Sequence, residues 1–144
     1  MRPVVPADAA AWIAMRRALW PDDETVGAEA QKYFDGTVRG LLHVLFAVDG
    51  AGRALGFAEL NIRAYAEGAE SERVAYLEGW YVVDDARRTG VGAALIRAAE
   101  DWGRAQGCTE FASDALLENE VSARAHTALG FREVERIRCF IKRI

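Results

Sequence analysis

The chain has 144 residues, 51% of them hydrophobic and 28% charged, and its formal net charge is −4. This profile is typical of one globular domain, because a chain of this length buries about 70% of its unfolded surface without staples. The acidic balance argues against a nucleic-acid-binding protein, and no apolar run is long enough to cross a membrane.

The termini and cysteines are informative about compartment and metal. Residues 1–6 lack the apolar core of a signal peptide, which favours a cytoplasmic protein. Cys108 and Cys139 have no metal-binding spacing, and we expect two buried thiols in a reducing compartment and no metal site.

Hydrophobic periodicity and turn residues predict the following elements. In chain order they are a strand at Arg2–Val5, a helix from Asp8 to Leu19, a helix at Thr25–Val38, strands at Leu42–Val48, Ala54–Ala64 and Val74–Val83, a helix at Gly90–Gln106, a strand at Cys108–Ser113, a helix at Glu118–Leu129 and a strand at Arg132–Lys142. Asp8 is the expected cap of the first helix. The order predicts a single α/β (strictly α+β) domain over residues 1–144, a mixed sheet with helices on both faces.

The most informative motif is Arg87-Arg88-Thr89-Gly90-Val91-Gly92, which follows an apolar strand and opens the longest expected helix. The first N–H groups of a helix have no partner inside it, and the helix dipole adds positive charge there. Glycines allow a ligand to approach the backbone closely. The motif therefore predicts an anion site, with a plain strand–helix turn as the alternative.

The Arg-x-x-Gly-x-Gly spacing and the element order resemble the GCN5-related N-acetyltransferases (GNAT), whose central parallel strands splay apart to hold acetyl-CoA. The resemblance implies that the pyrophosphate binds to the backbone N–H groups of Arg88, Thr89, Gly90, Val91, Gly92 and Ala93. Arg87 and Arg88 would add positive charge, with a solvated surface pair as the alternative. It also implies that the edge of Trp80, Tyr81, Val82 and Val83 pairs with the pantetheine arm, like an added strand. The Val82 N–H is the expected oxyanion donor.

Two further positions follow from the same resemblance. Asn119 corresponds to an asparagine that contacts the cofactor arm, although it could instead cap the following helix. His126 replaces a tyrosine that protonates the departing thiolate, and it is either that acid or a packing residue.

Two carboxylates lie in segments expected to be buried. Glu78 interrupts an apolar strand, and Asp114 ends the next strand. A charge in a strand is costly unless it is paired or used. An amine acceptor arrives protonated and must lose a proton before attack, so Asp114 or Glu78 is the expected general base.

Several segments together resemble the aminoglycoside 6′-N-acetyltransferases: Leu19–Asp22, Gly56–Glu59, Leu77–Gly79, Ala112–Asp114 and His126–Phe131. The resemblance implies acetylation of a small polycation, antibiotic resistance and a homodimer. It places Trp20 and Tyr65 in the antibiotic pocket, where each could otherwise be structural, and Glu78, Asp114 and Glu135 on its amines. Glu70 or Glu72 would reach a neighbouring subunit's pocket.

Two alternatives stay open. The acceptor could be a polyamine or a protein amine, with the reaction unchanged. From a different class, the chain could be a non-catalytic acyl-CoA-binding module, which would bind coenzyme A without transferring an acetyl group.

Overall fold

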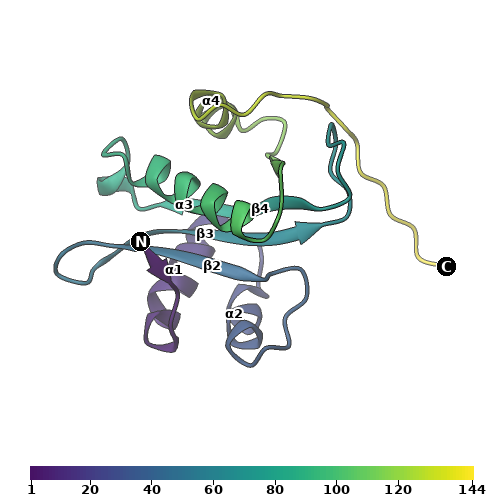
Figure 1. Cartoon of the computed structure of the whole chain (residues 1–144). Coiled ribbons are helices and arrows are strands. Elements are labelled where there is room, and N and C mark those ends of the chain that lie inside the picture. Colours follow the sequence, from purple (N-terminus) through teal and green to yellow (C-terminus); the bar gives the residue numbers. More distant parts are fainter.

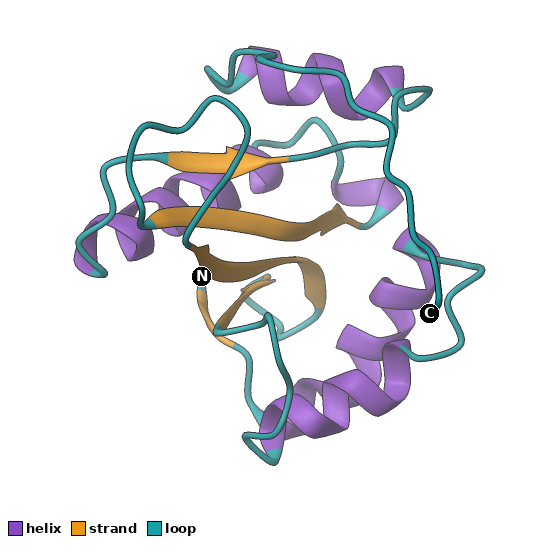
Figure 2. Ribbon diagram, turned by 90° about the vertical axis from the view of Figure 1, so that its right-hand side faces the viewer, coloured by secondary structure: helices purple, strands orange, loops and turns teal.

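A five-stranded sheet in the order β1-β2-β3-β4-β5 forms the centre of the computed structural model, which describes residues 1–144 (Figures 1 and 2). Neighbouring strands are antiparallel up to β4, and β4 and β5 are parallel. The elements are β1 (Arg2–Pro3), a 3-10 turn η1 (Pro6–Asp8), α1 (Ala9–Leu19), α2 (Val26–Phe34), β2 (His43–Val48), β3 (Ala54–Arg63), β4 (Val74–Val82), a 3-10 turn η2 (Asp84–Ala86), α3 (Val91–Ala105), β5 (Phe111–Ser113) and α4 (Glu120–Ala128).

Each face of the sheet carries its own core, because successive side chains of a strand point to opposite faces. Val44 and Phe46 of β2 pack against α1 and α2, around the fully buried Trp12. Leu45 and Ala47 of the same strand face the other way and pack against α3. Figure 1 shows α1 and α2 on one side of the sheet and α3 on the other. This arrangement confirms the expected mixed sheet.

A β-bulge in the second half of β4 determines which backbone groups face β5. Ala75 N–H donates to Glu110 O beside β5, whereas Val83 N–H, eight residues later, donates to Leu55 O beside β3. In a regular strand, residues an even number of positions apart direct their N–H groups to the same neighbouring strand. Ala75 and Val83 do not, so one extra residue must lie between them. The register shift places it at Glu78, since Glu59 pairs with Gly79 and Leu60 with Leu77.

The prediction of a last strand at Arg132–Lys142 is wrong. Residues 132–144 form no regular structure, and Phe140 and Ile141 are 90% and 97% exposed. The segment has alternating apolar character, but it forms no ladder with β5, which is only three residues long. A strand exists only where a neighbour accepts its hydrogen bonds, and sequence pattern alone does not supply that neighbour. Cys139 lies in this segment and is exposed, contrary to expectation, while Cys108 is buried.

Two boundaries also differ for local reasons. The Asp8 carboxylate does not cap α1; it binds the guanidinium of Arg2 at 2.6 and 2.8 Å and accepts the N–H of Val5. The second helix ends at Phe34 rather than Val38, because Gly36 adopts a left-handed φ of 70°. No helix combines the length and apolarity needed to cross a bilayer.

Candidate active site

The N-terminus of α3 is uncapped and has the features of an anion site. Gly90, at the N-cap, has φ 91°, and Arg88 is the one non-glycine residue with positive φ, at 62°. No side chain caps the helix, and the N–H groups of Val91, Gly92 and Ala93 have no acceptor within the chain. Three free donors at the positive end of a helix dipole fit a pyrophosphate.

The two arginines of this loop differ in availability. Arg87 is engaged within the chain: its Nε donates to Val82 O at 3.0 Å, and it forms an ion pair with Asp84 at 2.8 Å. Its guanidinium also lies over the Tyr81 ring. Arg88 is exposed and forms no ion pair, so Arg88 is the charge free to meet an anion. Thr89 stabilises the loop through a hydrogen bond from Oγ1 to Ala86 O at 2.6 Å.

The edge of β4 beyond the bulge is open toward β5. Pairing between the two strands ends at Leu77 and Ser113, so they separate from there on. Because Val83 N–H faces β3, the alternation of a strand turns Val82 N–H toward the gap. This direction fits the predicted oxyanion donor, and the bulge is what creates it.

Trp80 lies on this part of β4 and carries an orphaned donor. Its indole Nε1 is buried without a hydrogen-bond partner. The ring packs against the start of α3, where a Cβ on Gly92 would lie 2.9 Å from Trp80 Cζ2. A buried donor without an acceptor is costly, and an acceptor on a bound ligand would relieve that cost. With the free N–H groups of α3, the orphan supports the fit of coenzyme A here.

His126 and Asn119 lie on α4, across the gap. Asn119 Oδ1 accepts the N–H of Ser122 at 3.0 Å. Asn119 therefore caps the N-terminus of α4, as the alternative to cofactor contact predicted. His126 is half-buried: its Nε2 lies 2.9 Å from Ser113 Oγ and its Nδ1 lies 2.8 Å from Ser122 O. The ring meets those of Trp80 and Phe131 edge to face. Sequence reasoning found His126 but missed Ser113.

Glu78 and Asp114 gather around Arg63 and Tyr76. Glu78 accepts from Arg63 at 2.6 and 3.0 Å and from Asn61 at 3.0 Å. The Arg63 guanidinium lies 3.5 Å from the centre of the Tyr76 ring. Burial, and then the charge of Asp114, raise the pKa of Tyr76 to about 12. Asp114 itself is exposed and forms no ion pair.

A cavity of about 240 Å³ lies next to Trp20, on the face of the sheet that carries α1 and α2. Glu78 and Glu59 line it together with Trp20. The Trp20 ring covers Gly79, whose place a larger residue could not take, since a Cβ there would lie 2.5 Å from the indole. This contact places Trp20 directly over the bulge.

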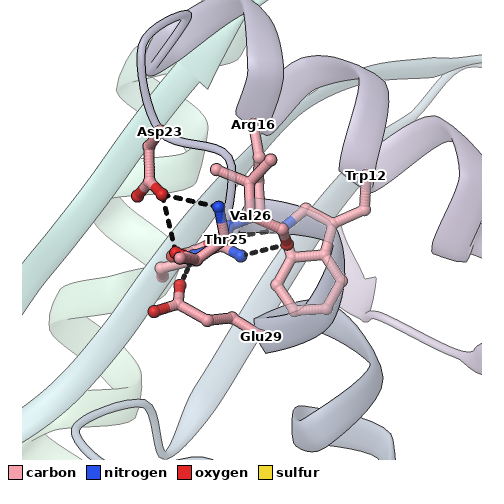
Figure 3. Close-up of polar contacts among 7 residues, drawn as sticks. Trp12, Arg16, Asp23, Thr25, Val26 and Glu29 are labelled. Carbon is pink, nitrogen blue, oxygen red and sulfur yellow. Dashed lines mark hydrogen bonds and ion pairs between the residues drawn. The ribbon is translucent and has the colours of Figure 1, made fainter.

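A buried polar cluster supports this cavity (Figure 3). Arg16 donates to Val26 O at 2.6 Å and to Glu29 at 2.7 Å, and its Nε lies 2.9 Å from Glu59 Oε1. Trp12 Nε1 donates to the same Glu59 oxygen at 2.9 Å. Burial nevertheless raises the pKa of Glu59 to about 7. The sequence indicates Glu59 only as the last residue of the motif Gly56–Glu59. Residue spacing does not show that its carboxylate is buried, and Glu59 is 2% exposed.

A larger groove of about 530 Å³ runs between β5, α4 and the C-terminal segment. Asp114, His126 and Glu135 line it, and further carboxylates make its wall acidic: Glu67, Glu100, Glu110, Glu120 and Glu133. The predicted substrate-binding residues are therefore divided between the cavity beside Trp20 and this groove. Tyr65, Glu70 and Glu72 line neither hollow, and Tyr65 is 67% exposed. No cluster of three or more His, Cys, Asp or Glu side chains is arranged to hold a metal.

Comparison with known proteins agrees with this geometry. Residues 11–131 match the model of the acetyltransferase (GNAT) family. The chain belongs to this family. A GNAT relative from Klebsiella aerogenes, aminoglycoside N(6′)-acetyltransferase type 1, is 54% identical over 144 residues, which are 99% of this chain and 95% of the relative. A protein of the same name from Stenotrophomonas maltophilia is 42% identical, over 95% of this chain and 88% of its own.

Solved structures of this GNAT group have the same fold. AAC(6′)-Iy, in complex with the bisubstrate analog CoA-S-monomethyl-acetylneamine, is 36% identical with a TM-score of 0.88, covering 99% of this chain and 97% of its own. The apo AAC(6′)-IG enzyme from Acinetobacter haemolyticus gives the same TM-score and coverage at 37% identity. GNAT proteins use acetyl-CoA, which the free N–H groups of α3 and the Trp80 orphan fit.

Proposed function

We propose that this protein transfers the acetyl group of acetyl-CoA to the 6′-amino group of aminoglycosides and so confers antibiotic resistance. The carrying observation is that an open helix N-terminus, a free strand edge and two carboxylates meet where β4 and β5 separate. The names of the relatives, which share nearly the whole length of the chain, support this substrate.

Donor binding is assigned to backbone groups. The N–H groups of 91–93 and the Arg88 side chain hold the pyrophosphate, and the edge of Trp80–Val83 pairs with the pantetheine arm. When bound, acetyl-CoA supplies an acetyl group already activated as a thioester. Val82 N–H then donates to the acetyl oxygen as it gains negative charge, a contribution of about 10²–10³ in rate for such a donor.

Asp114 is the better candidate for the general base. Glu78 already accepts three hydrogen bonds from Arg63 and Asn61, so both of its oxygens are engaged within the chain. Asp114 has no ion pair to give up. We therefore assign proton removal to Asp114, and to Glu78 the binding of an ammonium group beside Trp20. We assign Glu135, which lines the groove, to a distal amine of the antibiotic.

We infer that the protein works as a homodimer in the cytoplasm, where acetyl-CoA is made. The C-terminal segment supports this assembly, because exposed Ile137, Phe140 and Ile141 are apolar surface without a partner in one chain. In a dimer, Glu70 or Glu72 of the exposed loop, and Tyr65 beside it, would reach the pocket of the second copy.

A matched pair of antibiotics tests the reaction. Neomycin and paromomycin differ in carrying an amino or a hydroxyl group at the 6′ position. We expect thiol release from acetyl-CoA with neomycin, tobramycin and kanamycin, and none with paromomycin. Turnover with spermidine or a lysine peptide alone would instead establish the polyamine or protein-amine alternative. Binding of coenzyme A without transfer to any amine would establish a binding module.

A further inference from the structure

We propose that the Ser113 hydroxyl is the acid that protonates the departing sulfur, and that His126 supplies the proton through it. This assignment rests on the proposed acetyl transfer. It replaces direct proton donation by His126 with a two-residue relay between the end of β5 and α4.

The hydrogen bonds of the imidazole determine which nitrogen faces Ser113. Nδ1 lies 2.8 Å from Ser122 O and 3.3 Å from Ser122 Oγ. A carbonyl oxygen can only accept, so Nδ1 carries a hydrogen in both the neutral and the charged ring. The proton that comes and goes is therefore on Nε2, and Nε2 lies 2.9 Å from Ser113 Oγ.

Ser113 occupies the point where the two central strands separate. It pairs with Leu77 in the last step of the β4–β5 ladder, and Leu77 packs in the core beneath α3. Ser113 and Asp114 are consecutive, and consecutive side chains of a strand point to opposite faces. The relay thus lies on the α3 side of the gap, while Asp114 lies with Tyr76 on the other side.

This division matches the two proton transfers of the reaction. The amine loses a proton on the side of Asp114, and the sulfur gains one on the side of Ser113. The imidazole itself is poorly exposed to the sulfur, because its Nε2 is already bound to Ser113 and its ring packs against Trp80 and Phe131.

The step balances without any further reactant. As the bond between the acetyl carbon and sulfur breaks, its electron pair stays on sulfur. Ser113 Oγ gives its hydrogen to that sulfur and takes the Nε2 hydrogen of protonated His126. The products are the free thiol, intact Ser113 and neutral His126 with Nδ1–H still on Ser122 O. His126 regains a proton from water before the next turnover.

Three variants test the relay: Ser113→Ala, Ser113→Thr and His126→Gln. Thr127→Ala is the matched control, since it removes an exposed hydroxyl of the same helix that is bound only to Ala123 O. Single-turnover rates with neomycin report the chemistry, and calorimetry with coenzyme A reports binding. We expect Ser113→Ala and His126→Gln to slow transfer by about 10²-fold, within the range for a general acid. The affinity of both variants for coenzyme A should stay unchanged. Ser113→Thr keeps a hydroxyl group and should transfer within a few-fold of the wild-type rate.

A second measurement does not depend on activity. Long-range ¹H–¹⁵N spectra of the free protein should show the neutral His126 ring protonated at Nδ1, with an Nε2 resonance that moves in Ser113→Ala. The relay is overturned if Nε2 carries the hydrogen, if Ser113→Ala transfers as fast as Thr127→Ala, or if Ser113→Thr is as slow as Ser113→Ala. A wild-type protein that acetylates no amine would instead refute the proposed function itself, and the relay with it.

Discussion

Glu59 shows how strongly one residue's surroundings change its chemistry. Its carboxylate has Arg16 and Trp12 as partners, yet the loss of water outweighs them and raises its pKa to about 7. Between pH 4.5 and 7 the folded chain therefore keeps a proton that the unfolded chain has lost. By linkage, this residue's contribution to the free energy of unfolding falls as pH rises through that window.

Glu59→Gln should remove this pH dependence. We expect the wild type to lose up to about 1.4 kcal/mol per pH unit across the window relative to the variant. Urea unfolding at pH 5, 6, 7 and 8 measures the difference. Glu24→Gln, at an exposed carboxylate, is the control and should follow the wild type. Parallel curves for Glu59→Gln and the wild type would contradict the raised pKa.

The two candidate bases should separate kinetically. Asp114→Asn removes the proposed proton acceptor, so kcat should fall by about 10²-fold while coenzyme A affinity is retained. Glu78→Gln removes an ammonium-binding charge, so it should mainly raise KM for the antibiotic. Steady-state kinetics with calorimetry for coenzyme A check both. An unchanged kcat in Asp114→Asn would remove Asp114 from the mechanism.

At the scale of elements, the start of α3 and the bulge of β4 together form the proposed donor site. The helix offers three free N–H groups, and the bulge turns Val82 N–H into the gap beside them. Each feature depends on a glycine, for a different reason: one needs a left-handed backbone conformation, and the other needs room for a neighbouring ring. Gly90, with φ 91°, starts the helix, and Gly79 leaves room for Trp20 over the bulge.

Gly90→Val tests the anion site directly. A β-branched residue is strained at this φ by about 1–2 kcal/mol, and relief of the strain would turn the first N–H groups away. We expect the Kd for coenzyme A to rise at least about tenfold. Gly107→Val is the control, since Gly107 has φ 80° just beyond the other end of α3 and lies in open space. It should destabilise the fold similarly but leave the Kd unchanged; equal effects on Kd would contradict an anion site at Gly90.

At the scale of the whole molecule, one sheet separates two hydrophobic cores. The two parts of the proposed active site lie on its opposite faces, near the point where β4 and β5 separate. The cavity beside Trp20 lies on the α1 and α2 side, and the proposed relay lies on the side of α3 and α4. The C-terminal segment leaves this body and extends along its exterior (Figure 1). Several exposed apolar side chains lie on this segment, among them Ile137, Phe140 and Ile141.

Dimer formation should depend on that segment. The double variant Phe140→Ser with Ile141→Ser removes the two most exposed of its internal apolar side chains, so we expect monomers where the wild type gives dimers. Light scattering after size exclusion measures the mass. Leu42→Ser, at an exposed leucine before β2, is the control and should stay dimeric. A wild-type monomer at micromolar concentration would contradict the homodimer.

Much of this protein could be read from local pattern. Periodicity located the four α-helices and all five strands of the sheet, and the Gly-rich motif located the start of α3, because these signals act within a few residues. The errors share a cause. Asp8 found a partner in Arg2, and residues 132–144 found none for a ladder. Both outcomes depend on which residues lie nearby in the folded chain, and hydrophobic periodicity does not reveal that.

The sequence by itself determined the family, the fold class and the candidate residues of the donor site, since glycines and strand–helix order encode them locally. Only the tertiary structure decided how the chemistry is divided. The packing of α4 against β5 placed His126 beside Ser113, and burial set the pKa of Glu59. Such contacts join residues far apart in the chain, and their energies depend on distance and exclusion of water, which exist only after folding.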